Sequence, residues 1–385
     1  MMTRLGDVCT VISGSTPKTS VAEYWDGDIK WITPAELNED SFYLYDSQRH
    51  ITELGKEKTG LSYMPIGTVI LSSRAPIGKT AIAGCEMCCN QGFKNLICSD
   101  DIFNEYLYYF LKGKTDYLNS LGRGATFKEI SKSIVENIEI RLPALEEQKQ
   151  IARQLGEIYR LISLRKQQLA KLDELVKARF IELFGMPGED DFGWGLVPLG
   201  SVCCINPKKS QDARLGSGIK VSFVPMPAVT EHGEIDATSI KEYDEVKTGF
   251  TYFAENDVLF AKITPCMENG KGAVARDLYN GIGFGSTEFH VLRPISGKAN
   301  PYWIYMLTAF SQFRKDAASN MTGSAGQRRV PASFLENYRV AVPPIGMQEQ
   351  FAVFVEQTDK SKVAVQKALD EAQLLFDSLM QKYFG

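Results

Sequence analysis

Two segments, one in the middle of the chain and one at its end, carry apolar residues in alternating steps of four and three. Such a heptad pattern predicts long helices whose a and d positions face a partner helix. In the first segment the apolar seam positions are Ile151, Leu155, Ile158, Ile162, Leu169, Leu172, Val176 and Leu183. In the second segment, 200 residues further on, they are Phe351, Val355, Val365, Leu369, Phe376, Leu379 and Tyr383. We predict that these seams pair in a coiled coil, and we prefer this arrangement to two amphipathic helices that each pack only on their own domain.

The sequence contains two similar copies of one unit. The stretch "LPALEEQKQIA" from Leu142 recurs as "VPPIGMQEQFA" from Val342, and "LGDVCTVISGSTP" from Leu5 corresponds to "LGSVCCINPKKS" from Leu199. Self-similarity of this extent indicates a duplicated structural unit. In each copy, short strands broken by Gly, Pro, Asn and Asp surround one helical patch and are followed by the long helix, which is typical of an α+β domain.

The predicted fold class is therefore α+β, with two globular domains related by a pseudo-two-fold axis and joined by two long antiparallel helices. The predicted boundaries are 1–143 for the first domain, 144–185 for the central helix, 186–343 for the second domain and 344–385 for the last helix. A helix of this size is about 60 Å long, so the helix pair would hold the domains at opposite ends and at a fixed distance. The segment 145–184 carries eight basic and six acidic residues, and 345–384 carries four and six, so their charges are complementary.

Composition places the protein among soluble globular proteins. Of the 385 residues 44% are hydrophobic and 23% are charged, values that are ordinary for such proteins. The chain contains no apolar run of membrane-spanning length and begins without an apolar signal region, so we expect a cytoplasmic protein. The net charge of −4 argues mildly against a protein that coats nucleic acid unaided, although local basic loops can still bind it.

A metal site is poorly supported. Eight cysteines are expected to be reduced thiols, and the pair Cys85 and Cys88 lacks the second pair that a structural zinc site requires. The three histidines are scattered, which also leaves a histidine-based catalytic group without support. We therefore predict no metal in this chain.

The stretch "SSRAPIGKTAIAG" from Ser72 contains the triplet Gly78-Lys79-Thr80, which resembles part of a phosphate-binding loop. Ser73 stands where that loop needs its first glycine, and the residues after Thr80 are too few to form the helix that would hold the phosphate. The second copy, "NDVLFAKITPCMENGKGAVA" from Asn256, repeats the pattern of strand, turn and strand. We predict a β-hairpin in both copies and keep a nucleotide-binding enzyme as an alternative.

The motifs "LGDVCTVISGSTPK", "VILSSRAPIGKTAI", "NQGFKNL" and "IRLPALEEQKQIA", together with the duplication, resemble the specificity subunit of type I restriction-modification systems. This resemblance implies two target-recognition domains that read a bipartite site in double-stranded DNA, separated by two spacer helices that fix the spacing of the half-sites. It also implies that two modification subunits dock on the helices and methylate adenine N6 with S-adenosylmethionine. Restriction subunits, which use ATP and Mg²⁺, can join to cleave unmethylated DNA.

In that family the specificity subunit is not an enzyme, and this chain fits the role. Its nearest approach to the Asn/Asp-Pro-Pro-aromatic motif of amino-methyltransferases is Asn206-Pro207-Lys208-Lys209. It departs from the pattern in its second domain, which lacks a clean copy of the "SRAPIGK" turn. A coiled-coil adaptor whose domains bind proteins is the other alternative.

Basic and hydroxyl side chains on the predicted loops and hairpins are the candidates for DNA contacts, because phosphate binding needs such groups at particular places. We expect about half of them to touch DNA. In the first domain they are Ser15, Thr16, Lys18, Arg74, Lys79, Lys94, Arg123 and Lys128. In the second domain they are Lys208, Lys209, Lys262, Lys271, Arg328 and Arg329.

Overall fold

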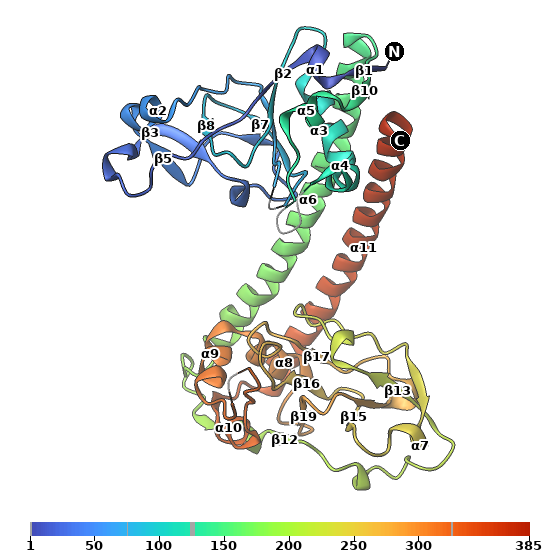
Figure 1. The fold of residues 1–385 in the computed structure, drawn as a ribbon. Coiled ribbons are helices and arrows are strands. Elements are labelled where there is room, and N and C mark those ends of the chain that lie inside the picture. The colour runs from blue at the N-terminus through green and yellow to red at the C-terminus, as the bar shows by residue number, and fades with distance from the viewer. Residues whose placement is uncertain (1, 75, 124–127, 325) are drawn as a thin grey trace. The chain divides into compact units, whose positions relative to one another are not determined.

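The computed structural model describes residues 2–74, 76–123, 128–324 and 326–385. The chain divides into two compact units, each with sheets, short helices and part of two long helices (Figure 1). Unit 1 contains Met1–Gln167 and Val365–Gly385, and unit 2 contains Gln168–Ala364. Each long helix therefore contributes one part to each unit. No helix in the described ranges has both the length and the apolar character needed to cross a membrane.

Unit 1 is built on a five-stranded sheet in the order β2-β9-β6-β7-β4. Its strands are β2 (Cys9–Ile12), β9 (Asn95–Cys98), β6 (Val69–Leu71), β7 (Thr80–Ala83) and β4 (Tyr43–Leu44). A second sheet has the order β5-β3-β8, with β5 (Arg49–Ile51), β3 (Trp25–Ile32) and β8 (Cys88–Cys89). The main core lies between the first sheet and the helices α3 (Asn104–Gly113), α4 (Thr115–Leu121), α5 (Lys132–Glu136) and the long helices.

Unit 2 repeats this plan with two four-stranded sheets. The sheet with the order β12-β19-β16-β17 contains β12 (Cys203–Ile205), β19 (Phe289–Pro294), β16 (Val258–Ala261) and β17 (Gly272–Val274). The sheet with the order β14-β13-β18-β15 contains β14 (Ile240–Glu242), β13 (Lys220–Val224), β18 (Ile282–Gly285) and β15 (Thr251–Ala254). Three short helices follow the strands of these sheets along the chain, as α3, α4 and α5 do in unit 1. They are α8 (Pro301–Ala309), α9 (Ser311–Ser319) and α10 (Ala332–Asn337).

The equivalence of the two units extends to strand register. Strands β6 and β7 pair antiparallel, as do β16 and β17, so both predicted hairpins are present. The first strand of each hairpin also pairs antiparallel with a later strand, through Val69 and Leu96 in unit 1 and through Val258 and Leu292 in unit 2. The predicted duplication of an α+β unit is confirmed.

The two predicted long helices are α6 (Leu145–Phe184) and α11 (Ile345–Phe384), each of 40 residues. Tyr383 Oη donates to Gln154 Oε1 at 2.7 Å in unit 1, where the rings of Tyr159 and Phe376 lie 5.9 Å apart. Along α6 from Gln154 to Tyr159, the contacted residue on α11 changes from Tyr383 to Phe376. The residue numbers therefore run in opposite directions, and the helices pack antiparallel in this unit.

The helices also pack antiparallel in unit 2. Lys362 Nζ lies 2.6 Å from Asp173 Oδ1, and the rings of Phe180 and Phe351 lie 5.5 Å apart. Every predicted apolar seam residue on α6 and α11 is buried or half-buried. Three further buried aromatic residues on these helices, Phe180, Phe184 and Phe384, were not among the predicted seam positions.

Candidate nucleic-acid interface

The Gly78-Lys79-Thr80 turn belongs to the hairpin of unit 1 and leads into a strand, because Thr80 is the first residue of β7. Gly78 has a φ of 96°, which glycine adopts at little cost. Lys79 Nζ donates to the main-chain carbonyls of Pro34 and Leu37. The turn therefore lacks the following helix that a phosphate-binding loop needs, and its lysine is held by carbonyl groups of the chain itself.

Two predicted basic residues of unit 1 meet at one carboxylate, that of Glu129. Lys94 Nζ lies 3.1 Å from Glu129 Oε1, and Arg74 Nη1 lies 4.0 Å from Glu129 Oε2. Arg123 and Glu129 exchange two main-chain hydrogen bonds of 3.1 and 3.0 Å. The N–H of Ile130 donates to the carbonyl of Ser73 at 3.1 Å and so ties this loop to the hairpin. We call these residues the Glu129 cluster.

The loop with Ser15 and Thr16 lies beside this cluster. Thr16 Oγ1 donates to the side chain of Gln91 at 2.5 Å, and the carbonyl of the next residue, Gly92, accepts from the N–H of Ser73 at 2.8 Å. Ser15 is fixed by main-chain hydrogen bonds, donating to the carbonyl of Cys89 and accepting from Trp31 Nε1. Lys128 is exposed next to Glu129, whereas Lys18 is exposed further along the Ser15 loop.

Unit 2 has an equivalent cluster around Glu288. Arg329 donates to this carboxylate from Nε at 2.9 Å and from Nη2 at 2.8 Å. The N–H of Lys262 donates to the carbonyl of Glu288, and the carbonyl of Lys262 accepts from the N–H of Val330, both at 2.9 Å. His290 Nε2 donates to the carbonyl of Val330 at 2.8 Å. We call these residues the Glu288 cluster.

The two clusters occupy the same place in the two units but carry opposite charges at one equivalent position. Ser73 and Lys262 each accept a main-chain hydrogen bond from the loop before the last short helix. The residue just before the donor is Glu129 in unit 1 and Arg329 in unit 2. Equivalent scaffolds therefore present an acid in one unit and a base in the other.

The electrostatics of the Glu288 cluster favour a fixed negative charge among cations. Hydrogen bonds from Arg329 lower the pKa of Glu288, so this carboxylate is ionised at neutral pH. Burial lowers the pKa of Lys262, and the charge of Arg329 acts in the same direction. Burial likewise lowers the pKa of His290, which favours its neutral form.

The other predicted residues of unit 2 lie at different places. Arg328 Nη2 donates to the carbonyl of Ala318 at 2.7 Å, so its guanidinium is partly engaged by helix α9. Lys271 is half-buried, and its carbonyl accepts from the N–H of Ala261 beside Lys262. Lys208 is exposed, and Lys209 Nζ donates to the carbonyl of Lys247, which lies between β14 and β15 of the second sheet.

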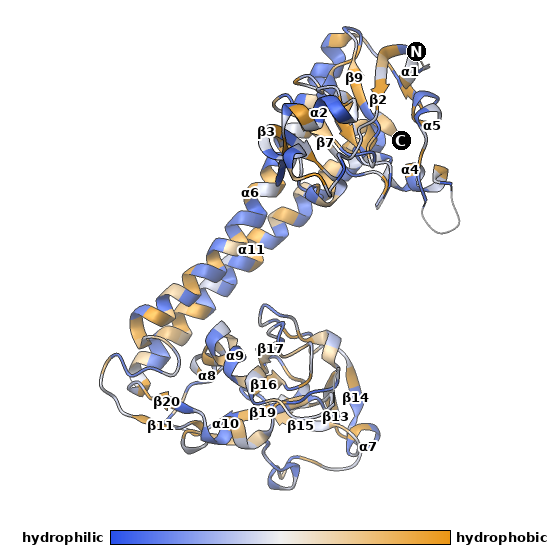
Figure 2. Cartoon of the chain, turned by 60° about the vertical axis from the view of Figure 1, so that its left-hand side comes forward, coloured by the Kyte–Doolittle hydropathy of each residue, from blue (hydrophilic) through white to orange (hydrophobic). Residues whose placement is uncertain are grey.

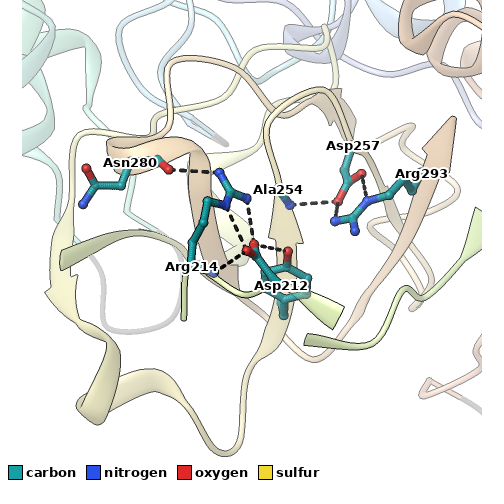
Figure 3. Close-up of polar contacts among 7 residues, drawn as sticks. Asp212, Arg214, Ala254, Asp257, Asn280 and Arg293 are labelled. Atoms are coloured by element: carbon teal, nitrogen blue, oxygen red, sulfur yellow. Dashed lines mark hydrogen bonds and ion pairs between the residues drawn. The ribbon is translucent and has the colours of Figure 1, made fainter. Parts of the chain in front are cut away.

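The prediction from sequence selected cations and missed the acids that orient them. Besides Glu129 and Glu288, Asp212 binds Arg214 through Nε at 2.9 Å and Nη2 at 2.7 Å (Figure 3). Arg214 also donates from Nη1 to the carbonyl of Asn280. The hydrogen bonds from Arg214 to Asp212 hold the pKa of Asp212 well below its usual range. Asp212 and Arg214 are two residues apart, so their pairing could have been predicted from the sequence. The acids of the two clusters are distant in sequence from their partners.

Comparison with known proteins supports one family for the whole chain. The family described as "Type I restriction modification DNA specificity domain" matches residues 1–174 and 192–372. The chain is 29% identical to the type I restriction enzyme MjaIX specificity subunit of Methanocaldococcus jannaschii, over 98% of this chain and 91% of that protein. It is 35% identical to the EcoEI specificity subunit of Escherichia coli, over 62% of this chain and 39% of that protein.

Solved structures agree on the fold. The S subunit of a type I restriction-modification system from M. genitalium superposes with a TM-score of 0.57 at 14% identity, covering 100% of this chain and 96% of that one. A chain from a study of assembly and conformational transition of the type I restriction-modification system gives the same TM-score at 19% identity, covering 100% and 97%.

Proposed function

This chain belongs to the type I restriction-modification DNA specificity family, and from that premise we propose that each unit reads one half of a bipartite DNA site. The observation that carries the proposal is the pair of equivalent clusters, one around Glu129 and one around Glu288. They share main-chain hydrogen bonds but differ in the charges that they present. Two readers on one scaffold with different side chains suit a site whose halves differ in sequence.

The clusters supply both kinds of contact that DNA recognition needs. Exposed or half-buried cations such as Arg74, Arg123, Lys128 and Lys262 can approach phosphates, which supply most of the affinity but carry no sequence information. Side chains held in one orientation by an acid can instead reach base edges in the major groove. Because the net charge of the chain is −4, we propose that DNA binds at the local basic clusters and that partner subunits supply further positive charge.

The catalytic groups would come from partner subunits. Modification subunits would bring S-adenosylmethionine to an adenine N6, and restriction subunits would bring ATP and Mg²⁺. We place the surface for such partners on the long helices, along which Figure 2 shows hydrophobic residues among hydrophilic ones. Leu161 and Leu164 of α6 and Leu374 and Leu375 of α11 are 43%, 49%, 72% and 51% exposed. Exposed apolar residues on these helices can form part of an interaction site.

The decisive experiment is to express the chain with its modification subunit in a host without adenine methylation and to sequence the methylated sites. We expect one asymmetric bipartite motif that requires both proteins, and cells with the modification subunit alone are the control. Methylation that does not depend on this chain would contradict the proposal. Binding of ATP by the isolated chain would favour the nucleotide enzyme, and assembly with partners that never protect DNA would favour the adaptor.

A further inference from the structure

We propose that Arg329 reads a guanine in the half-site bound by unit 2 and that Glu288 is the positioning residue that aims it. This inference rests on the DNA-reading function proposed above. It adds the residue that determines specificity and the base that it selects.

The hydrogen bonds of Arg329 leave one edge of its guanidinium available. An arginine side chain has five N–H donors. Two of them, on Nε and Nη2, bind the carboxylate of Glu288 at 2.9 and 2.8 Å, and one on Nη1 donates to the carbonyl of Gln327 at 3.1 Å. Among the described residues, one N–H on Nη1 and one on Nη2 remain without a partner. Two such donors on adjacent nitrogens match the O6 and N7 acceptors of guanine, the commonest specific arginine contact.

Glu288 fixes the plane and direction of this edge before DNA arrives. The carboxylate holds the guanidinium side-on, so less side-chain freedom is lost on binding. Glu288 is itself fixed, because its carbonyl accepts from the N–H of Lys262 and its own N–H donates to Ser286 Oγ at 3.2 Å. The Arg329 side chain nevertheless remains 40% exposed, so a base edge can reach it.

A second arginine in unit 2 has the same hydrogen-bond pattern, which makes location the deciding factor. Arg214 also uses Nε and Nη2 for a carboxylate and Nη1 for a carbonyl (Figure 3). It contacts Asn280 just before β18, whereas Glu288 follows the other end of that strand. Gly281, which faces Arg214, also lies beside Glu255, whose carboxylate accepts from the N–H of Asp277. Glu255 would repel phosphates near Arg214, whereas Lys262 and Arg328 beside Arg329 would attract them.

Unit 1 does not reproduce this reader. The equivalent position is Glu129, whose carboxylate already lies 3.1 Å from Lys94 and 4.0 Å from Arg74. The guanine contact is therefore assigned to one half-site only.

The test uses the complete chain with its modification subunit, and genomic DNA of a methylation-free host is the probe. The methylated motif of the unaltered complex is compared with those of Arg329→Gln, Glu288→Gln and the matched control Arg214→Gln. We expect Arg329→Gln to relax one guanine position of one half-site, with discrimination falling roughly 5- to 150-fold on duplexes that differ at that base. Glu288→Gln should relax the same position more weakly, and Arg214→Gln should leave the motif unchanged.

The possible outcomes separate this inference from the proposed function. If the unaltered complex yields no bipartite motif, the proposed function fails. If that motif is present but Arg329→Gln leaves it unchanged, or Arg214→Gln relaxes it equally, the guanine assignment is overturned. Uniform loss of methylation by folded Arg329→Gln and Glu288→Gln would also overturn it, because it would indicate a phosphate contact. Should Arg329→Gln fail to fold by thermal unfolding, Glu288→Gln alone decides between these outcomes.

Discussion

Gln148 and Gln348, 200 residues apart, make the same three side-chain hydrogen bonds in their respective units. Each side-chain oxygen accepts from a main-chain N–H near the start of a helix, that of Phe103 or Asn300, at 2.8 Å. Each side-chain nitrogen donates to two main-chain carbonyls, one of them that of the proline five residues earlier. Both glutamines are fully buried, so each fastens the start of a long helix to its own domain.

Replacing Gln148 by leucine should destabilise unit 1 by about 3 kcal/mol, because a buried N–H and two carbonyls lose their partner. Gln348→Leu should have a similar effect on unit 2. Gln150→Leu, at an exposed position two residues further along the same motif, is the control and should change stability by less than about 0.5 kcal/mol. Denaturant unfolding of the full chain measures all three, and equal effects of Gln148→Leu and Gln150→Leu would argue against the fastening role.

The long helices are expected to set the spacing of the two half-sites. Inserting four residues after Lys171 of α6 and four after Val363 of α11 lengthens both helices by about 6 Å and keeps their pairing. Because DNA rises about 3.4 Å per base pair, the gap of the methylated motif should change by one or two base pairs, or methylation should fail. Insertion into α6 alone is the control that breaks the pairing. Full activity with an unchanged gap would show that the helices do not set the distance.

A chain truncated to residues 1–185 is expected to form a homodimer. In the full chain, Phe384 packs on Tyr106 and Phe110 of unit 1, with ring centroids 5.1 and 5.9 Å apart. The truncation removes Phe384, but Phe184 of a second copy stands at the equivalent helix position. Symmetric pairing should then direct methylation to a palindrome built from the first half-site.

Size-exclusion chromatography with light scattering and sequencing of methylated sites check this prediction. Phe184→Ser in the truncated chain is the control and should weaken the dimer. A truncated chain that still methylates the original asymmetric site would contradict separable readers.

Charged residues on the outer surface of the helices should weaken binding of the modification subunit. Leu161→Glu and Leu374→Glu each place a charge where an apolar contact is expected, at a cost of about 2 kcal/mol or roughly 30-fold in affinity. Gln167→Glu, at an exposed polar position of α6, is the matched control. Titration of the purified subunits by calorimetry gives the affinities, and unchanged values for both leucine variants would place docking elsewhere.

Unit 2 should lose stability as the pH falls below about 6.5, the ordinary pKa of histidine. Burial lowers the pKa of His290, and Asn206 Nδ2 lies 3.0 Å from His290 Nδ1, so the folded state favours the neutral ring. The unfolded chain then binds the proton more readily, and stability decreases with decreasing pH. The fall in stability between pH 7.5 and 5.5 should be smaller for His290→Gln than for the unaltered chain. An identical fall in both would exclude His290 as its source.

The duplication, the α+β units, the two hairpins and the paired helices could be predicted from the sequence alone. These features depend on residues that are close together in the chain. The heptad spacing places Ile151 and Leu155 on one face of a helix, and the turn at Gly78 is followed by a strand that begins at Thr80. The buried Phe184 and Phe384 were outside the predicted seam because each directly follows a seam position. Phe184 packs on Phe351 of the partner helix in unit 2, and Phe384 packs on Tyr106 and Phe110 in unit 1.

Which polar side chains contact one another depends on the tertiary structure. Glu129 lies 35 residues from Lys94, Arg329 lies 41 residues from Glu288, and Gln148 lies 45 residues from Phe103. Such pairs depend on which loops the sheet brings together, and no helical or strand period encodes that separation. The sequence therefore indicated a reader of DNA with two domains, whereas the fold decided that a cation in each domain is held by an acid and that the acid's position differs between them.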